Sequence, residues 1–267
     1  MASPITGGCW PRSDVSDGLP VLWQYSFSNY NEKARWALDF KGIRHRRQSL
    51  MPGAPRAMWY SRGDGTIPVV DLDGERIVDS TAIIAALEER QAEPALYPAD
   101  PDERHRALEL EEYFDEHAGH DMRRVGFWEL RDNLGYAVSF MTTNQPKIRG
   151  AMGRAGLRVA FPVVWRYMSA RYKFTQEAVE RSRATLIAAL DRIEVERAGG
   201  DYLVGGRFTV ADLTAAALLY PLVWPTEYQY DLPEAPEWEF LEPHRDHPAL
   251  GWIRETWRRH RGARADG

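Results

Sequence analysis

Residues 19–42 have the sequence LPVLWQYSFSNYNEKARWALDFKG. The apolar run at 19–25, bounded by a glycine and a serine, predicts a strand. Across 31–40, apolar residues recur at helical spacing, and Gly42 stands where a helix C-terminal cap belongs. A strand that passes almost directly into a helix places the hydroxyl of Ser28 at the opening of that helix.

The mixed strand and helix pattern continues beyond this unit. An Asp-Gly pair at 73–74, between two apolar runs, predicts a hairpin turn. In chain order we expect an edge strand at 44–50, a short helix within 52–62, hairpin strands at 66–72 and 75–78, and a helix from Asp79. The predicted order of elements is β-α-β-α-β-β-α.

The pattern changes to a helical one after a proline-rich segment. We divide the chain into a flexible tail at 1–18, a mixed domain at 19–92, a linker at 93–101 and an all-helical domain at 102–262. Amphipathic helices are predicted through 110–121, at 175–197, from Thr209, and at about 249–260. Segment 141–174 is basic, aromatic and predicted helical, and segment 226–243 is a proline-rich irregular excursion.

Composition excludes several classes of protein. The net charge of −5 argues against a nucleic-acid or anionic-membrane binder, because both need a basic face. No apolar run approaches the roughly 20 residues that a bilayer span needs, and the first residues do not resemble a signal peptide. The single cysteine, Cys9, excludes an intramolecular disulfide and argues against a cysteine-based metal cluster. A cytoplasmic protein without a metal site is expected.

Ser28 has a possible chemical role. Helix N-termini present free N–H groups and partial positive charge, and they stabilise an anion held there. A hydroxyl that donates to a thiolate beside such a terminus would lower the thiol pKa from its usual value near 8.5. The alternative is that Ser28 only caps the helix, as serine often does.

Three further segments carry local signals. Pro68, inside an apolar strand, fits an edge strand with a trans bond, or a cis bond that turns the backbone of Ile67 toward a ligand. Asp79 and Ser80 open a helix, where they could hold a ligand or act as caps. Thr209, with Asp212 three residues later, forms a capping box, which is a folding device.

Together these segments resemble the cytosolic glutathione transferase superfamily, over roughly residues 19–260. SNYNEKARWALDFKGI is similar to its first active-site turn and helix, TIPVV to its cis-proline strand, DSTAI to its glutamyl-binding turn, and FTVADLTAAALL to its helical-domain capping box. The resemblance implies a thioredoxin-like first domain, an all-helical second domain, glutathione as co-substrate and a homodimer.

The resemblance also assigns site residues by position. Ser28 would hydrogen-bond the glutathione sulfur, with Tyr25 and Asn31 as alternatives. Other residues would bind the rest of glutathione: Ile67 beside Pro68 the cysteinyl part, and Asp79 with Ser80 the γ-glutamyl end. Asn29 stands where proline is frequent, and Asn31 where many bacterial relatives carry cysteine. Without a thiol in the turn, dithiol redox chemistry is excluded.

The resemblance also implies a pocket for the electrophile along the first helix of the second domain. Candidates are Tyr113, Phe114, His117, Asp121 and Arg124. His117 and Asp121 have the i, i+4 spacing of a metal or general-base pair, but the apolar stripe on which His117 lies favours a packed or pocket-lining residue. The Arg123-Arg124 pair meets either an anionic substrate or solvent.

Three functions follow. The leading one is activation of the thiol of glutathione, or of a related thiol, for attack on a small hydrophobic electrophile. The second is a glutathione-dependent isomerase or dehalogenase-type enzyme that uses the same thiol site. The third is a non-catalytic relative that binds ligands or partners, with the excursion at 226–243 as a partner surface, a lid or a plain loop.

Overall fold

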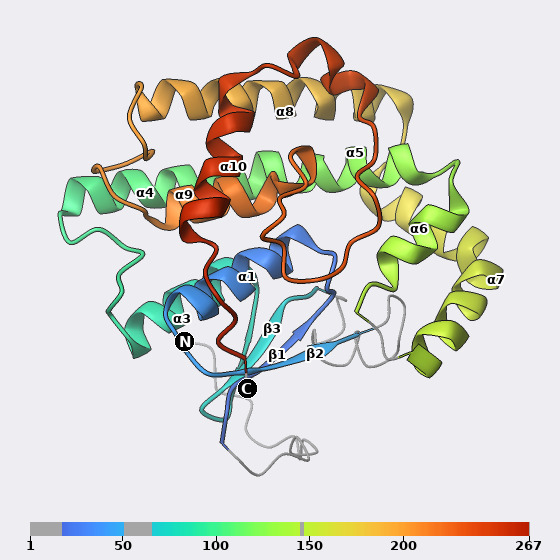
Figure 1. Ribbon diagram of the computed structural model, residues 1–267, viewed down its shortest axis with the longest axis horizontal. Coiled ribbons are helices and arrows are strands. Elements are labelled where there is room, and N and C mark those ends of the chain that lie inside the picture. Colours follow the sequence, from blue (N-terminus) through green and yellow to red (C-terminus); the bar gives the residue numbers. More distant parts are fainter. Residues whose placement is uncertain (1–17, 51–65, 145–146, 267) are drawn as a thin grey trace, which may run out of the picture.

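The computed structural model describes residues 18–50, 66–144 and 147–266. Residues 1–17 of the predicted tail, which include Cys9, and the short helix expected within 52–62 lie outside these residues. Over the described residues the order of elements confirms a small mixed layer followed by helices (Figure 1). The domain boundaries drawn from the sequence stay a prediction.

The first layer is a twisted four-stranded sheet with strand order β2-β1-β3-β4. Strand β1 pairs in parallel with β2 and antiparallel with β3, and β3 forms a hairpin with β4. Asp73 and Gly74 both have positive φ, at 52° and 85°, which is the conformation that a two-residue hairpin turn needs. The bounds are β1 Val21–Gln24, β2 Arg46–Ser49, β3 Val69–Leu72 and β4 Glu75–Val78.

Helices build up over one face of this sheet (Figure 1). α1 and α3 lie between the sheet and the helical half, and α1 packs against α9. The bounds are α1 Asn29–Phe40, α3 Ser80–Arg90, α4 Pro101–Tyr113, the π-helix η1 Phe114–Gly119, α5 His120–Leu130, α6 Leu134–Met141, α7 Lys147–Tyr172, α8 Gln176–Arg197, α9 Val210–Leu218, η2 Tyr220–Leu222, η3 Glu239–His244 and α10 Pro248–His260. No helix in the described part of the chain is long and apolar enough to cross a membrane.

One hydrophobic cluster joins the two halves through α1. Trp36 is fully buried, and its ring centre lies 4.7 Å from that of Trp257 on α10. The predicted capping box is present: the carboxylate of Asp212 accepts bonds from the N–H and the hydroxyl of Thr209, at 2.8 and 2.9 Å. It also accepts the N–H of Leu203 at 2.8 Å, so this box fixes the preceding loop as well.

The chain returns to the first layer after α10 (Figure 1). Arg261 is buried and donates to Glu32 at 2.5 Å and to Asp39 at 2.9 Å, both on α1. Burial alone would raise the pKa of Asp39, but the guanidiniums of Arg261 and Arg47 lower it. The N–H of Ala265 also donates to Asp39, at 2.8 Å. The C-terminal segment therefore completes the polar packing of α1.

Candidate functional site

The turn between β1 and α1 presents Ser28 to a cavity. The N–H of Ser28 donates to the carbonyl of Tyr25 at 3.2 Å, and its own carbonyl accepts the N–H of Glu32 at 2.9 Å, which starts the helix. Ser28 is thus the N-cap residue by position, yet its hydroxyl makes no capping hydrogen bond. The hydroxyl lies half-buried in the cavity lining, where it is available to a ligand.

Asn31, one alternative to Ser28, has a structural assignment. Its side chain is buried; its Oδ1 accepts the N–H of Tyr25 at 3.1 Å, and its Nδ2 donates to the carbonyl of Ile67 at 3.3 Å. Asn31 is not among the residues that line the cavity. Its amide therefore ties the turn to the segment before Pro68.

Tyr25, the other alternative, does line the cavity. Burial, together with Tyr172 and Tyr167, raises the pKa of Tyr25 to about 12. The phenol therefore stays protonated at neutral pH and has a proton to donate in a hydrogen bond. Ser28 and Tyr25 remain the two hydroxyl candidates for contact with a bound sulfur.

The proline segment and the start of α3 form the next part of the lining. The Ile67–Pro68 bond is cis, and both residues line the cavity. Asp79 caps α3, because its Oδ1 accepts the N–H groups of Thr81 and Ala82 at 2.9 and 3.1 Å. Ser80 is buried in the cavity wall, and its Oγ has no hydrogen-bond partner in the described part of the chain. A buried hydroxyl without a partner is costly, so Ser80 fits a polar ligand.

A buried ammonium group holds these segments beside the helical half. Lys33 on α1 is fully buried, and its Nζ lies 2.8 Å from Glu111 on α4 and 2.5 Å from Asp115 on η1. It also donates to the hydroxyl of Thr81, at the start of α3, at 2.8 Å. Lys33 therefore connects the segment that carries Ser80 to the first helices of the second half.

The π-helix η1 lets α1 approach closely. A Cβ on Gly119 would lie 2.7 Å from Cζ of Tyr30, nearer than side chains tolerate. The carbonyls of Gly119 and Leu218 accept hydrogen bonds from Nδ2 of Asn29, at 3.4 and 3.1 Å. Asn29 stands at the position where relatives often carry proline. Its side chain links the turn to η1 and α9 through these two hydrogen bonds.

Replacing Gly119 by alanine should lower the free energy of unfolding by about 1–3 kcal/mol, because the Tyr30 ring must move in a packed site. Gly126 is the matched control, since a Cβ there meets its nearest atoms at 3.9 Å. Gly126→Ala should be neutral or slightly stabilising through helix propensity. Urea unfolding of both variants checks this; an equal effect of the two would contradict the role assigned to Gly119.

The cavity has a volume of about 1020 Å³. That lies at the upper end of the range for ligand pockets. Its second half is apolar and is formed by α5, α6 and α7, together with Phe27, whose ring centre lies 5.1 Å from that of Phe140. The principal apolar lining residues there are Phe127, Leu130, Phe140, Met141, Val164 and Met168.

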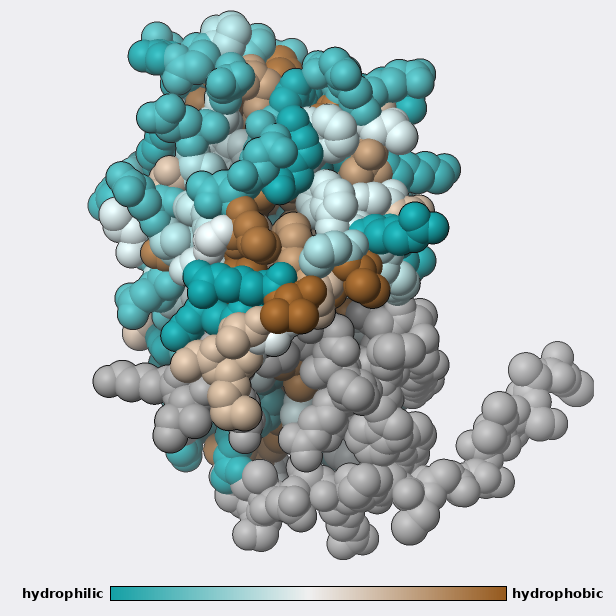
Figure 2. All heavy atoms as spheres, turned by 90° about the vertical axis from the view of Figure 1, so that its right-hand side faces the viewer, coloured by the Kyte–Doolittle hydropathy of each residue, from teal (hydrophilic) through white to brown (hydrophobic). Residues whose placement is uncertain are grey.

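The outer side of α7 adds apolar surface next to the opening. Figure 2 shows hydrophobic side chains gathered in the middle of this face, with hydrophilic ones above them. Met152, Val159 and Val163 are exposed on α7, and Val163 also belongs to the cavity lining. The apolar half of the cavity therefore continues onto its rim.

Of the five residues predicted for an electrophile pocket, only Arg124 lines the cavity. Tyr113, Phe114, His117 and Asp121 lie outside it: Phe114 is in the core, and Asp121 is bound by Arg124 and Ser182. The reason is the wide turn of η1, which shifts the helix face relative to regular α-helical spacing. Arg123, the other member of the Arg123-Arg124 pair, also lines the cavity, together with Asp115, Glu116, His120 and Phe127.

His117 and Asp121, whose spacing also suits a metal or general-base pair, do not contact each other. His117 is exposed and packs against the Tyr113 ring, while the carboxylate of Asp121 bonds elsewhere. Among the described residues, no group of three or more His, Cys, Asp or Glu side chains could hold a metal ion.

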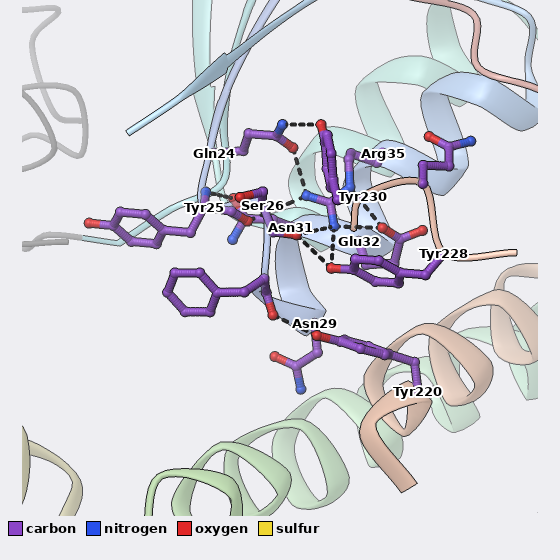
Figure 3. Close-up of polar contacts among 12 residues, drawn as sticks. Gln24, Tyr25, Ser26, Asn29, Asn31, Glu32, Arg35, Tyr220, Tyr228 and Tyr230 are labelled. Carbon is purple, nitrogen blue, oxygen red and sulfur yellow. Dashed lines mark hydrogen bonds and ion pairs between the residues drawn. The ribbon is translucent and has the colours of Figure 1, made fainter. Parts of the chain in front are cut away.

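Behind the turn, Arg35 organises a buried polar cluster (Figure 3). The guanidinium donates to Glu32 and Gln24, both at 2.7 Å, and to the carbonyl of Ser26 at 3.1 Å. Burial would lower the pKa of Arg35, but Glu32 and neighbouring tyrosines raise it, so the charge is permanent. Arg35 thereby fixes the carbonyl groups of the turn that carries Ser28.

The excursion at 226–243 closes this cluster from outside. The hydroxyl of Tyr228 donates to the carbonyl of Ser26 at 2.6 Å, and the Tyr230 hydroxyl accepts from Gln24, also at 2.6 Å (Figure 3). Trp238, further along, is buried and lines the cavity. These parts of the excursion therefore pack on the site.

Comparisons with known proteins agree with this architecture. Residues 22–95 match the family model "Glutathione S-transferase, N-terminal domain", and residues 176–255 match "Glutathione S-transferase, C-terminal domain". The two models together match more than half of the chain. A maleylacetoacetate isomerase of Rhizobium meliloti (strain 1021) is 36% identical over 94 residues, which are 34% of this chain and 44% of that protein. The match thus spans less than half of the relative's length.

Solved structures share the fold along nearly the whole chain. The beta-etherase LigF from Sphingobium sp. strain SYK-6 is 19% identical, with a TM-score of 0.65 over 91% of this chain and 96% of that one. A glutathione S-transferase from Methylobacillus flagellatus KT, solved with glutathione bound, is 18% identical, with a TM-score of 0.60 over 90% and 95% of the two chains. At these identities the likeness concerns the fold alone.

Proposed function

Because the chain belongs to the glutathione S-transferase superfamily, we propose that it activates the thiol of glutathione for attack on a small, largely hydrophobic electrophile. One observation carries the proposal: the hydroxyl of Ser28, which makes no capping bond, and that of Ser80, which has no partner among the described residues, line the same cavity as the cis Ile67–Pro68 segment. A polar, anionic ligand of extended shape fits that arrangement.

The residues have distinct roles in this proposal. The hydroxyl of Ser28 donates a hydrogen bond to the sulfur, and the N-terminus of α1 stabilises the thiolate charge. Ser80 donates to a γ-glutamyl carboxylate, and Asp79 faces the amino group. The backbone of Ile67 pairs with the cysteinyl part. In conjugation, the thiol proton leaves to solvent, the S–C bond forms, and the leaving group departs with its electron pair.

A second candidate uses the same thiol site. The partial relative carries the name of an isomerase, which favours glutathione-dependent isomerisation. In that case the thiol adds to the substrate and is expelled again, so free glutathione is regenerated in every turnover. Product analysis distinguishes the two reactions, because only the transferase leaves an adduct. A cytoplasmic location and a homodimer belong to the proposal as expectations from the family.

Glutathione binding tests the proposal, with Ser80→Ala as the key variant. A hydrogen bond to a charged group is worth about 1.5–3 kcal/mol, so the dissociation constant for glutathione should rise about tenfold or more. Thr214→Val is the matched control, because the Thr214 hydroxyl is likewise buried without a partner in the described residues but does not line the cavity. It should bind as the wild type does.

Isothermal calorimetry on the three proteins gives the result. Wild-type protein that does not bind glutathione would contradict the proposal and favour a different cellular thiol or a non-catalytic relative. Equal affinities in wild type and Ser80→Ala would remove Ser80 from the site.

A further inference from the structure

Arg123 is a cation in the cavity, and no described carboxylate pairs with it. It lies on α5 and lines the cavity, and its Nε is buried with no hydrogen-bond partner among the residues that the structure describes. Its Cζ lies 5.1 Å from the centre of the Tyr30 ring and 4.8 Å from that of Tyr172. In the part of the chain that the structure describes, this guanidinium is held by two aromatic rings and forms no ion pair.

The neighbouring arginine, Arg124, lines the same cavity but is bonded within the protein. Arg124 donates to Asp121, to the hydroxyl of Ser182 and to the carbonyl of Tyr172, the last two at 2.6 and 2.9 Å. These bonds satisfy its guanidinium and fix the end of α7, which brings the Tyr172 ring beside Arg123. Arg124 therefore has a structural role in the cavity lining. The guanidinium of Arg123 has N–H groups without partners among the described residues, and these can donate to a ligand in the cavity.

The carboxylates that line the cavity do not neutralise Arg123. Asp115 is paired with Lys33, and Asp79 is bound by N–H groups of α3. Glu116 is exposed on η1 and forms no ion pair among the described residues. Near Tyr172, the further charged side chains in the lining are Arg171 and Lys173, both cations exposed at the rim. None of the described carboxylates thus forms an ion pair with Arg123, and a partly buried cation there is stabilised by an anion from outside.

The apolar side chains around Arg123 indicate what kind of molecule bears the anionic group. Phe127 belongs to the same helix as Arg123, and it lines the cavity together with Phe140 and Met168. A planar guanidinium binds a carboxylate through two parallel hydrogen bonds, and aromatic walls favour a flat apolar body.

We propose that Arg123 binds the carboxylate of the electrophilic substrate, so that the substrate class is aromatic or unsaturated carboxylic acids. The identity of the reaction rests on the proposed function, whereas the binding site for the acid does not.

The test compares an acid with its neutral ester. Wild-type protein is titrated with 3,5-dinitrobenzoate and with methyl 3,5-dinitrobenzoate, with tryptophan fluorescence as the readout. The acid should bind at least tenfold more tightly than the ester. Arg123→Met keeps the stem between the rings and should lose this preference, while its affinity for glutathione stays within twofold of wild type.

Arg131→Met is the matched control. Arg131 lies on the Trp128 ring at the end of α5, with Cζ 4.2 Å from the ring centre, and it does not line the cavity. This variant should keep the preference for the acid. If Arg123→Met does not fold, added salt gives the same answer in wild type: the affinity for the acid should fall several-fold between 0.05 and 0.5 M NaCl, and that for the ester should not.

Each outcome of these titrations supports or overturns the assignment of Arg123. Equal affinity of wild type for acid and ester overturns the proposal. So does an Arg123→Met variant that loses glutathione affinity but keeps the acid preference, because Arg123 would then bind a carboxylate of glutathione. A protein that prefers the acid, loses the preference in Arg123→Met and conjugates nothing supports the site while contradicting the proposed function.

Discussion

Replacement of Ser28 by alanine should raise the pKa of the thiol of bound glutathione and lower kcat/KM for an aryl halide about 10- to 100-fold at neutral pH. A hydrogen bond to a charged acceptor contributes about 1.5–3 kcal/mol, and one pKa unit corresponds to about 1.4 kcal/mol. The expected shift of the thiol pKa is therefore about one to two units. The defect should shrink as the pH rises through the raised pKa, because the thiol then ionises without help.

Ultraviolet absorbance of the thiolate, titrated with and without protein, measures this pKa directly. Tyr25→Phe is the control, since it keeps the ring in the cavity lining and removes only the second candidate hydroxyl. It should behave as the wild type. If the thiol pKa in Ser28→Ala equals that in the wild type, and the thiol pKa in Tyr25→Phe is higher, the contact with sulfur belongs to Tyr25.

Replacement of Lys33 by methionine should lower the free energy of unfolding by about 3–5 kcal/mol, because removing one partner of a buried ion pair leaves an uncompensated charge. Glu111, with 3% of its side chain exposed, would keep Thr81 as its remaining partner but lose its countercharge. Since Thr81 follows Ser80, glutathione affinity should fall as well. Chemical denaturation and calorimetry measure the two effects.

Arg181→Met provides the control for a surface pair. Arg181 and Glu177 lie on α8 with most of their side chains exposed, so their loss should cost less than about 1 kcal/mol. The double variant Lys33→Met/Glu111→Met should recover part of the lost stability, because it removes the more deeply buried of the two carboxylates that Lys33 neutralises and leaves only that of Asp115. If the double variant were as unstable as the sum of both single variants, the ionic explanation would be wrong.

Parts of both halves were predictable because their signals are local. The apolar run at 19–25 contains β1, the Asp73-Gly74 pair makes the hairpin turn, and Thr209 with Asp212 forms the expected capping box. Each depends on a few neighbouring residues. Ser28, Pro68 and Ser80 were instead assigned through the family resemblance, and although far apart in sequence they all line one cavity.

The pocket along α4 to α5 was not predictable from periodicity. One π-helical turn at 114–119 moves Tyr113 and His117 away from the cavity and brings His120 and Arg123 into its lining. Regular helical spacing has no means of anticipating that turn. Whether Arg123 or Arg124 would be free also depended on Ser182 and Tyr172, more than forty residues further along the chain.

The role of segment 226–243 was equally hidden. Its composition suits a surface loop, but Tyr228 and Tyr230 place their hydroxyls on the partners of Arg35. The buried charges of α1 explain why such a cover is needed, since a desolvated guanidinium requires several acceptors and aromatic neighbours.

Arg261 has a consequence for the order of events during synthesis. Domains commonly fold one after another as the chain leaves the ribosome, the N-terminal one first. Here Glu32 and Asp39 are buried in the first layer, where they pair with Arg35 and Arg47, and each also receives an ion pair from Arg261, which is synthesised more than 200 residues later. The polar packing of α1 is therefore incomplete until α10 and Arg261 have emerged. The two halves are expected to reach their native packing together, and the first half produced alone should not reach it.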